Sequence, residues 1–197
     1  MPTALTPAEA LESLKAGNAR FVAGTQRTDP FDAGVLELAS GQSPHAIVLG
    51  CSDSRVPIET IFDQAPGNVF VVRVAGNFLN DDVLGSIEFG VAVLKARLIV
   101  VLGHTNCGAV TAAVAHARDG TTQPGYIARL VTAIAPAAEA TRDLPGDWIV
   151  NATAENVRRA VQAMSVFSAI VAGAISGGDV EVAGGIYELH TGRVSFF

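Results

Sequence analysis

Short unbroken runs of apolar residues recur along the chain, and polar or small residues follow each run directly. Ala46 to Gly50 and Leu98 to Leu102 are too short for helices and carry no polar side chain, which is typical of strands buried on both faces of a parallel sheet. Val69 to Val74 is mostly β-branched and predicts another strand. Val180 to Leu189 and Arg193 to Phe197 predict a strand, a turn and an edge strand. The pattern therefore predicts a central sheet of four to five strands.

Apolar residues at helical spacing fill the intervals between these runs. Thr6-Pro7-Ala8-Glu9 has the pattern of a capping box and predicts a helix that ends near Gly24. Short helical pieces are expected near 35–39 and 58–63. The longer predicted helices cover Val83 to Lys95, Asn106 to Ala117, Gly125 to Ala140 and Trp148 to Ile175. Strands that alternate with helices indicate the α/β class, with a mostly parallel sheet flanked by helices.

A single domain accounts for the whole chain. Its 197 residues, of which 49% are hydrophobic and 16% charged, are enough for one packed core, and neither a linker nor a repeat divides them. Residues 1–40 are predicted to form an N-terminal helical arm without a strand of its own. The apolar stripe of this arm needs a surface to pack against, either in its own chain or on a second copy.

Charge and hydropathy exclude several classes of partner. The net charge is −6, and the 13 basic residues are scattered, which argues against a nucleic-acid surface. The N-terminus lacks the basic and apolar regions of a secretory signal. The longest weakly polar run, Ala163 to Ile175, is shorter than the ~18 to 20 residues that a membrane span needs. We therefore expect a cytoplasmic protein that binds neither nucleic acid nor membrane.

Both cysteines of the chain directly follow predicted buried strands. Cys51 follows Gly50, while His104 and Cys107 lie just beyond the Leu98 to Leu102 run. Because the carboxyl ends of parallel strands meet at one edge of a sheet, two thiols and an imidazole are expected to lie together there. Zinc matches this soft set of ligands best, and three protein ligands leave a fourth position for water, as in catalytic sites. The sequence thus predicts one catalytic zinc ion per chain.

Two charged residues follow the first cysteine at intervals of two. Asp53 is placed to accept a hydrogen bond from the zinc-bound water, and Arg55 can hold the Asp53 carboxylate bidentately and keep it ionised. Two thiolates cancel the charge of the ion, so this water is expected to be less acidic than in a three-histidine site, where its pKa is roughly 7.

The motifs Cys51-Ser52-Asp53-Ser54-Arg55 and Gly103-His104-Thr105-Asn106-Cys107-Gly108 resemble the signatures of the β-class carbonic anhydrases, and the likeness extends from about Leu5 to Val194. The resemblance implies zinc ligation by the two cysteines and His104, with Asp53 and Arg55 as the catalytic dyad. It further implies reversible hydration of carbon dioxide to bicarbonate and a proton, with zinc-bound hydroxide as nucleophile. In some members of that family the aspartate replaces water as a zinc ligand at low pH.

The resemblance also has implications for the substrate pocket and for assembly. It places Gln42, Phe70, Phe89 and Gly108 at a substrate pocket, although the position of Phe89 is often tyrosine in plant-like members. It favours a homodimer or homotetramer in which the N-terminal arm packs on the partner.

A regulatory site for bicarbonate is only partly represented. Arg73 and Tyr187 resemble two members of a trio that holds non-catalytic bicarbonate in allosteric relatives, but Val48 stands where the trio has tryptophan. We therefore expect neither strong inhibition by bicarbonate nor sigmoid kinetics.

Other interpretations of the same residues remain open. The two cysteines could be inert core thiols or a disulfide, and a zinc ion with Asp53 as fourth ligand could be structural. Asp53 and Arg55 could form a simple ion pair, and the three pocket residues Gln42, Phe70 and Phe89 could be ordinary packing residues.

Other functions also fit parts of the pattern. A cysteine hydrolase would need only one cysteine and would survive a chelator. Hydrolases of carbonyl sulfide or carbon disulfide share the fold and metal ligands of the resembled family. A zinc-binding module without enzymatic activity is a further alternative.

Overall fold

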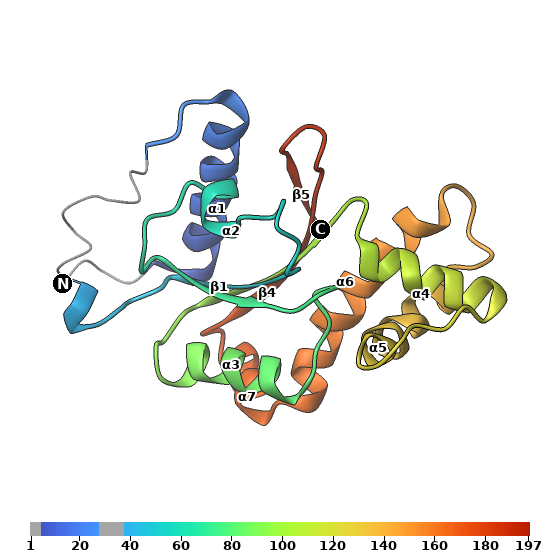
Figure 1. The fold of residues 1–197 in the computed structure, drawn as a ribbon. Helices are drawn as coiled ribbons and strands as arrows, with labels where there is room; N and C mark the ends of the chain where they lie inside the picture. The colour runs from blue at the N-terminus through green and yellow to red at the C-terminus, as the bar shows by residue number, and fades with distance from the viewer. Residues whose placement is uncertain (1–4, 28–37) are drawn as a thin grey trace.

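The computed structural model describes residues 5–27 and 38–197, and one five-stranded sheet forms its centre, with strand order β2-β1-β3-β4-β5 (Figure 1). The strands are β1 (Ala46–Gly50), β2 (Val69–Arg73), β3 (Leu98–His104), β4 (Glu181–Tyr187) and β5 (Val194–Phe196). The strands β1 to β4 pair parallel with one another, and β5 pairs antiparallel with β4. The predicted α/β class with a mostly parallel sheet is confirmed.

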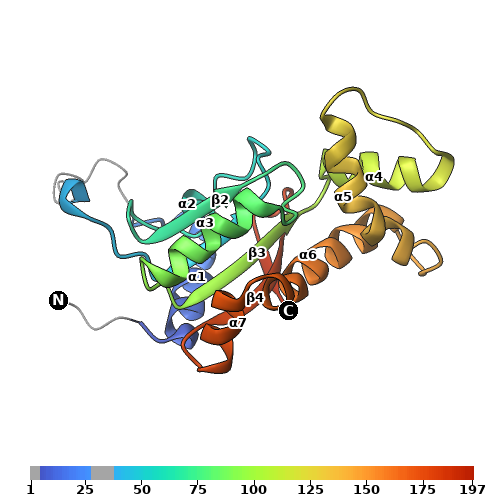
Figure 2. The ribbon, with the colours of Figure 1, turned by 90° about the horizontal axis from the view of Figure 1, so that it is seen from below.

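Helices cover both faces of the sheet and its carboxyl end (Figures 1 and 2). They are α1 (Pro7–Ala23), α2 (Ile58–Ile61), α3 (Asp81–Ala92), α4 (Gly108–Asp119), α5 (Ile127–Ala140), α6 (Trp148–Phe167) and α7 (Ala169–Ser176). The first two lie on one face, whereas α3, α6 and α7 lie on the other. The pair α4 and α5 packs together beyond the end of β3, where the candidate ligands emerge.

Alternate residues of the central strands enter two different cores. Ala46 and Val48 of β1 pack in the cluster beneath α1 and α2, while Ile47 and Leu49 pack in the cluster beneath α3, α6 and α7. All residues of β1 and β3 are buried, which explains why their sequences are apolar without alternation.

The N-terminal helix α1 begins and ends as predicted. The Thr6 side chain accepts a hydrogen bond from the Glu9 N–H, the Glu9 side chain accepts one from the Thr6 N–H, and Gly24 ends the helix at φ 67°. Ala10 and Leu14 of α1 are fully buried in the core of their own chain. Contact of the N-terminal arm with a partner chain stays a prediction.

The single helix predicted from Trp148 to Ile175 is wrong, because α6 and α7 meet at Ser168 with a bend of 95°. Ser168 has extended backbone, and its Oγ caps α7 by accepting the Val171 N–H at 3.0 Å. The same Oγ donates to Glu88 Oε1 of α3 at 2.6 Å. The two residues are 80 positions apart, so the spacing of apolar residues within the helix does not reveal this contact. Within residues 5–27 and 38–197, no single helix has the length and apolar character to cross a membrane, although the bent pair passes that test when taken together.

Other predicted boundaries shift by a few residues. The helix expected from Asn106 starts at Gly108, because Asn106 adopts left-handed φ of 55° and Cys107 is the N-cap. The helix expected to reach Lys95 ends at Ala92, the one expected from Gly125 starts at Ile127, and the one expected over 58–63 ends at Ile61. Of the piece expected at 35–39, residues 35–37 lie outside the described residues, and a 3₁₀ turn covers 38–40.

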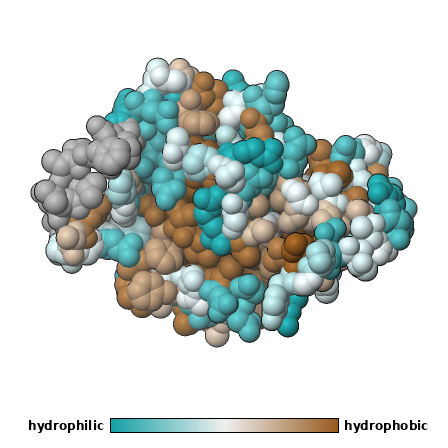
Figure 3. All heavy atoms as spheres, in the orientation of Figure 1, coloured by the Kyte–Doolittle hydropathy of each residue, from teal (hydrophilic) through white to brown (hydrophobic). Residues whose placement is uncertain are grey.

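One face of the molecule gathers apolar side chains across its middle (Figure 3). β2 is an edge strand, and its first three residues are only half-buried. The rings of Phe70 on β2 and Phe89 on α3 lie 6.1 Å apart between centroids, and Phe89 is 46% exposed. An exposed aromatic beside an open sheet edge is typical of a surface that meets another protein chain.

Candidate metal centre

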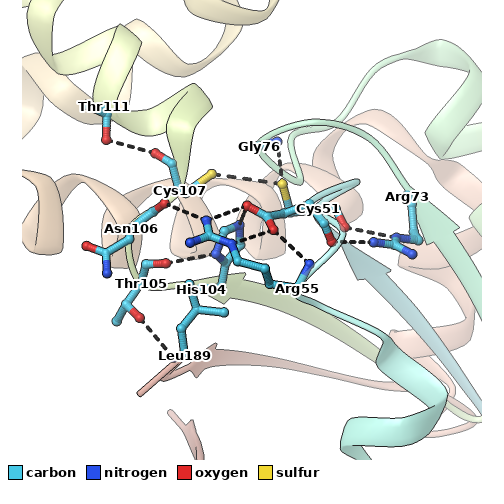
Figure 4. Close-up of polar contacts among 11 residues, drawn as sticks. Cys51, Arg55, Arg73, Gly76, His104, Thr105, Asn106, Cys107, Thr111 and Leu189 are labelled. Atoms are coloured by element: carbon cyan, nitrogen blue, oxygen red, sulfur yellow. Dashed lines mark hydrogen bonds and ion pairs between the residues drawn. The ribbon is translucent and has the colours of Figure 1, made fainter. Parts of the chain in front are cut away.

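The carboxyl ends of β1 and β3 bring Cys51, His104 and Cys107 together (Figure 4). Their ligand atoms all lie within 4.8 Å of one another, and all three residues are buried. The two sulfur atoms are 4.0 Å apart and both thiols are free, so the disulfide alternative is wrong for this structure. The three residues singled out from the sequence thus form one group that could bind a metal ion.

His104 is oriented with one ring nitrogen held and the other available. Its Nδ1 lies 2.9 Å from the carbonyl oxygen of Thr105, and because a carbonyl only accepts, Nδ1 carries the proton. Nε2 is buried and has no hydrogen-bond partner among the described residues. A buried polar nitrogen is costly unless something binds it, and a neutral imidazole fixed through Nδ1 is the usual form of a metal-bound histidine. The donor set therefore fits a metal ion.

Thr105 is itself tied to the neighbouring strand. Its N–H donates to the Tyr187 carbonyl at 3.0 Å, and its Oγ1 donates to Glu188 Oε1 at 3.0 Å. The Leu189 N–H donates to the same Oγ1 at 3.1 Å (Figure 4). These bonds fix the carbonyl group that orients the imidazole.

The two thiols have opposite tendencies to ionise. The Cys107 thiol beside Cys51 lowers the pKa of Cys51, against the effect of burial, and the Gly76 N–H adds to this by donating to Cys51 Sγ at 3.2 Å. The pKa of Cys107 is raised by the neighbouring Cys51 and by burial, although backbone N–H groups at the start of α4 oppose the shift. Cys51 therefore ionises more readily than Cys107, and a cation between the sulfurs would favour a second negative charge at 4.0 Å.

Asp53 lies beside this group and is clamped by Arg55. Arg55 donates from Nε to Oδ1 at 2.9 Å and from Nη2 to Oδ2 at 2.7 Å, and its backbone N–H donates to Oδ1 at 2.9 Å. These hydrogen bonds lower the pKa of Asp53. Asp53 Oδ2 is 3.9 Å from His104 Nε2, so an ionised acceptor stands next to the candidate metal position. The bidentate geometry is as expected, while the catalytic role of the pair stays a prediction.

Arg73 makes a contact that the sequence did not indicate. Its Nε donates to the Cys51 carbonyl at 3.0 Å and its Nη2 donates to the Asp53 carbonyl at 2.7 Å. Arg73 is the last residue of β2 and pairs in register with Gly50, directly before Cys51. The charged side chain therefore holds the backbone of the loop that carries both a ligand and the acidic residue. Predicting this contact from the sequence would have required the register in which β2 pairs with β1.

The other residues of the suggested bicarbonate trio lie elsewhere on the sheet. Tyr187 belongs to β4, and β1 and β3 separate that strand from β2, which carries Arg73. Val48 is fully buried in β1. The regulatory prediction is not tested by these positions.

The predicted substrate-pocket residues divide into two groups. Gly108 is the first residue of α4, next to Cys107, and a Cβ there would meet no atom within 4 Å. Phe70 pairs with Ile47 near the start of β1, so it lies about four residues, or roughly 13 Å of extended chain, from Cys51. Phe89 packs beside Phe70, and the exposed Gln42 precedes β1 at its amino end. Within one chain, Gly108 adjoins the metal group, whereas Gln42, Phe70 and Phe89 do not.

A family model, sequence relatives and solved structures all indicate the same protein family for this chain. The family model described as carbonic anhydrase matches residues 46–194. The chain is 43% identical over 192 residues to carbonic anhydrase 2 of Mycobacterium tuberculosis, covering 95% of this chain and 91% of that protein. Among solved structures, the β-carbonic anhydrase of Aspergillus fumigatus superimposes with a TM-score of 0.75 at 28% identity, covering 95% of this chain and 90% of that one. A tetrameric β-carbonic anhydrase of Sordaria macrospora gives 0.73 at 26% identity, with 95% of each chain covered.

Proposed function

Since the chain belongs to the β-class carbonic anhydrase family and is an enzyme of that kind, we propose that it hydrates carbon dioxide reversibly to bicarbonate and a proton with one zinc ion held by Cys51, His104 and Cys107. The observation that carries the proposal is the buried Nε2 of His104, which has no hydrogen-bond partner among the described residues and is grouped within 4.8 Å with the sulfur atoms of two free, buried thiols. Two sulfurs and one nitrogen match the preferences of zinc and leave one position open.

The zinc ion would supply a Lewis acid that lowers the pKa of a water molecule and so provides the nucleophile for carbon dioxide. The residues of the chain orient this reaction. Asp53 accepts a hydrogen bond from the attacking water and so directs its oxygen lone pair toward the substrate. Arg55 keeps that carboxylate ionised and fixes its orientation, because it donates a hydrogen bond to each of the two carboxylate oxygens.

The remaining contacts reduce motion of these groups. Arg73 holds the Cys51 and Asp53 carbonyls, and Thr105 holds the imidazole of His104 in the tautomer that offers Nε2. Fixed donors and acceptors lower the barrier because they need not reorganise during the reaction.

We also propose a homodimer or a multiple of it as the working unit, located in the cytoplasm. The half-buried edge strand β2 and the exposed Phe89 support a shared surface. Since Gln42, Phe70 and Phe89 do not adjoin the metal group of their own chain, they reach a substrate pocket only if a partner chain presents its site to them. The tetrameric relative from Sordaria macrospora is consistent with such assembly.

Stopped-flow assay of purified enzyme, with and without chelator, tests the proposed activity. We expect carbon dioxide hydration that disappears with the metal and returns with added zinc. Activity that survives complete removal of metal would contradict the proposal, as a cysteine hydrolase would predict. Rapid hydrolysis of carbonyl sulfide with negligible turnover of carbon dioxide would assign the chain to the other activity known on this metal site.

A further inference from the structure

One buried side chain outside the ligand group is connected to it through a single glycine. Asn156 of α6 is 5% exposed, and its Nδ2 donates to the carbonyl oxygen of Gly76 at 2.8 Å. The two residues are 80 positions apart in the sequence. A buried amide is costly without partners, so this hydrogen bond fixes where the Gly76 segment lies relative to α6.

Gly76 presents its own N–H to the sulfur of Cys51. It is the third residue of a turn in which the Asn77 N–H donates to the Val74 carbonyl at 2.9 Å, and its φ is 83°, as a type II turn requires. The Gly76 N–H lies 3.2 Å from Cys51 Sγ (Figure 4). A Cβ at this position would lie 2.4 Å from Ile134 Cδ1, so only glycine fits at this positive φ without moving the Ile134 side chain of α5. The direction of this N–H is therefore set by the turn and by what holds the turn.

The same part of α6 also contacts the segment that carries His104. A Cβ on Gly103 would lie 2.7 Å from Val157 Cγ2 and 3.5 Å from Thr153 Cγ2, so α6 packs directly on the backbone before His104. Adjacent residues of α6, Asn156 and Val157, thus touch the segments that position two of the three candidate ligands. The helix acts as a shared support for ligands that come from different strands.

We propose that Asn156 is a positioning residue for the metal centre, acting through the Gly76 N–H on the Cys51 sulfur; this rests on the proposed function, because it assumes that Cys51 binds zinc. An N–H that points at a thiolate stabilises its charge and fixes the sulfur in the geometry that the metal needs. Without the Asn156 amide, the turn loses the bond that holds its carbonyl, and the N–H···S contact becomes longer and more variable. The metal is then held less tightly, although all three ligands are still present.

The zinc affinities of variants test the hydrogen bond from Asn156 to the Gly76 carbonyl. Asn156→Leu keeps the branched shape of the side chain and removes the donor, and we expect zinc affinity to fall about tenfold in competition with a chromophoric chelator, within the range for residues that support metal ligands. Asn151→Leu is the matched control, because Asn151 lies on the same helix and also donates from Nδ2 to a backbone carbonyl, that of Pro145 at 3.0 Å, at a half-buried position away from the ligand segments. Its affinity should stay at the wild-type value. Equal affinities for Asn156→Leu and the wild type would overturn the proposal.

A measurement on the wild type does not depend on whether a variant folds. In protein loaded with NMR-active cadmium, we expect scalar coupling between cadmium and the amide proton of Gly76, and coupling between the Asn156 side-chain nitrogen and the Gly76 carbonyl carbon. Metal-loaded protein that lacks either coupling would overturn this inference alone. Failure of the wild type to bind cadmium or zinc at Cys51 would overturn the proposed function, and the inference with it.

Discussion

Arg55 occupies both carboxylate oxygens of Asp53, with Nε 2.9 Å from Oδ1 and Nη2 2.7 Å from Oδ2. The carboxylate so held lies 3.9 Å from the unpartnered Nε2 of His104. An acid with two charged hydrogen bonds stays ionised and cannot turn freely. In the proposed reaction, this pair therefore determines both the charge and the direction of the group that faces the reacting water.

Asp53→Asn should retain zinc but lose activity by roughly 100-fold or more, because the amide offers no charged acceptor to the reacting water. Carbon dioxide hydration and metal content, measured on the same samples, check this. Asp119→Asn is the matched control, since Asp119 also pairs with an arginine, Arg118, but at the exposed end of α4. Near-wild-type activity in folded, zinc-loaded Asp53→Asn would show that the pair is only a structural contact.

Arg55→Ala should lower activity by a similar factor, about 100-fold, because Asp53 is then free to turn toward the metal position. Zinc content should remain at one ion per chain, since Arg55 donates to no ligand atom among its described contacts. Arg118→Ala should leave activity unchanged. The prediction fails if the Arg55→Ala variant hydrates carbon dioxide as fast as the Arg118→Ala variant.

Gly76→Ala should destabilise the fold more than the same change at another left-handed glycine. Gly120 has φ of 75° and open space around it, so Gly120→Ala costs only the backbone strain of about 1 kcal/mol. Gly76 has φ of 83° and would place its Cβ 2.4 Å from Ile134 Cδ1, so the added overpacking brings the loss to roughly 2 to 4 kcal/mol. Urea unfolding of metal-free protein measures both losses, and equal values would contradict the close approach of α5 to this turn.

Phe89→Lys should weaken the proposed assembly, because it places a charge on the exposed apolar surface beside β2. Light scattering should give at least two chains for the wild type and a shift toward the 20.3 kDa monomer for the variant. Phe167→Lys is the control, since Phe167 is also exposed, at 72%, but lies at the end of α6. A wild type that is a fully active monomer would refute the shared pocket while leaving the zinc chemistry in place.

Much of the fold follows from local pattern. Strands buried on both faces, such as β1 and β3, have continuous apolar sequences, and the capping box and terminal glycine delimit α1. The ligands could be located because parallel strands end at one edge, so residues that follow Gly50 and Leu102 must lie together.

Contacts between distant segments could not be predicted from these patterns. The break between α6 and α7 lies at Ser168, which is held by Glu88 of α3, and the weakly polar run from Ala163 to Ile175 continues on both sides of it. The carbonyl clamp of Arg73 and the link from Asn156 to Gly76 also depend on how strands and helices pack. Ala10 and Leu14 of the N-terminal arm are a further example, because an apolar stripe on a helix predicts burial but does not identify the surface that buries it.

Metal analysis of the purified wild type beside Cys107→Ser tests most directly whether Cys51, His104 and Cys107 bind one zinc ion. The wild type should contain one zinc ion per chain, and the variant should contain far less, because a serine hydroxyl does not replace a thiolate as a zinc ligand. Wild-type protein with well below one zinc ion per chain, and no difference between it and Cys107→Ser, would show that these three residues do not form a zinc site.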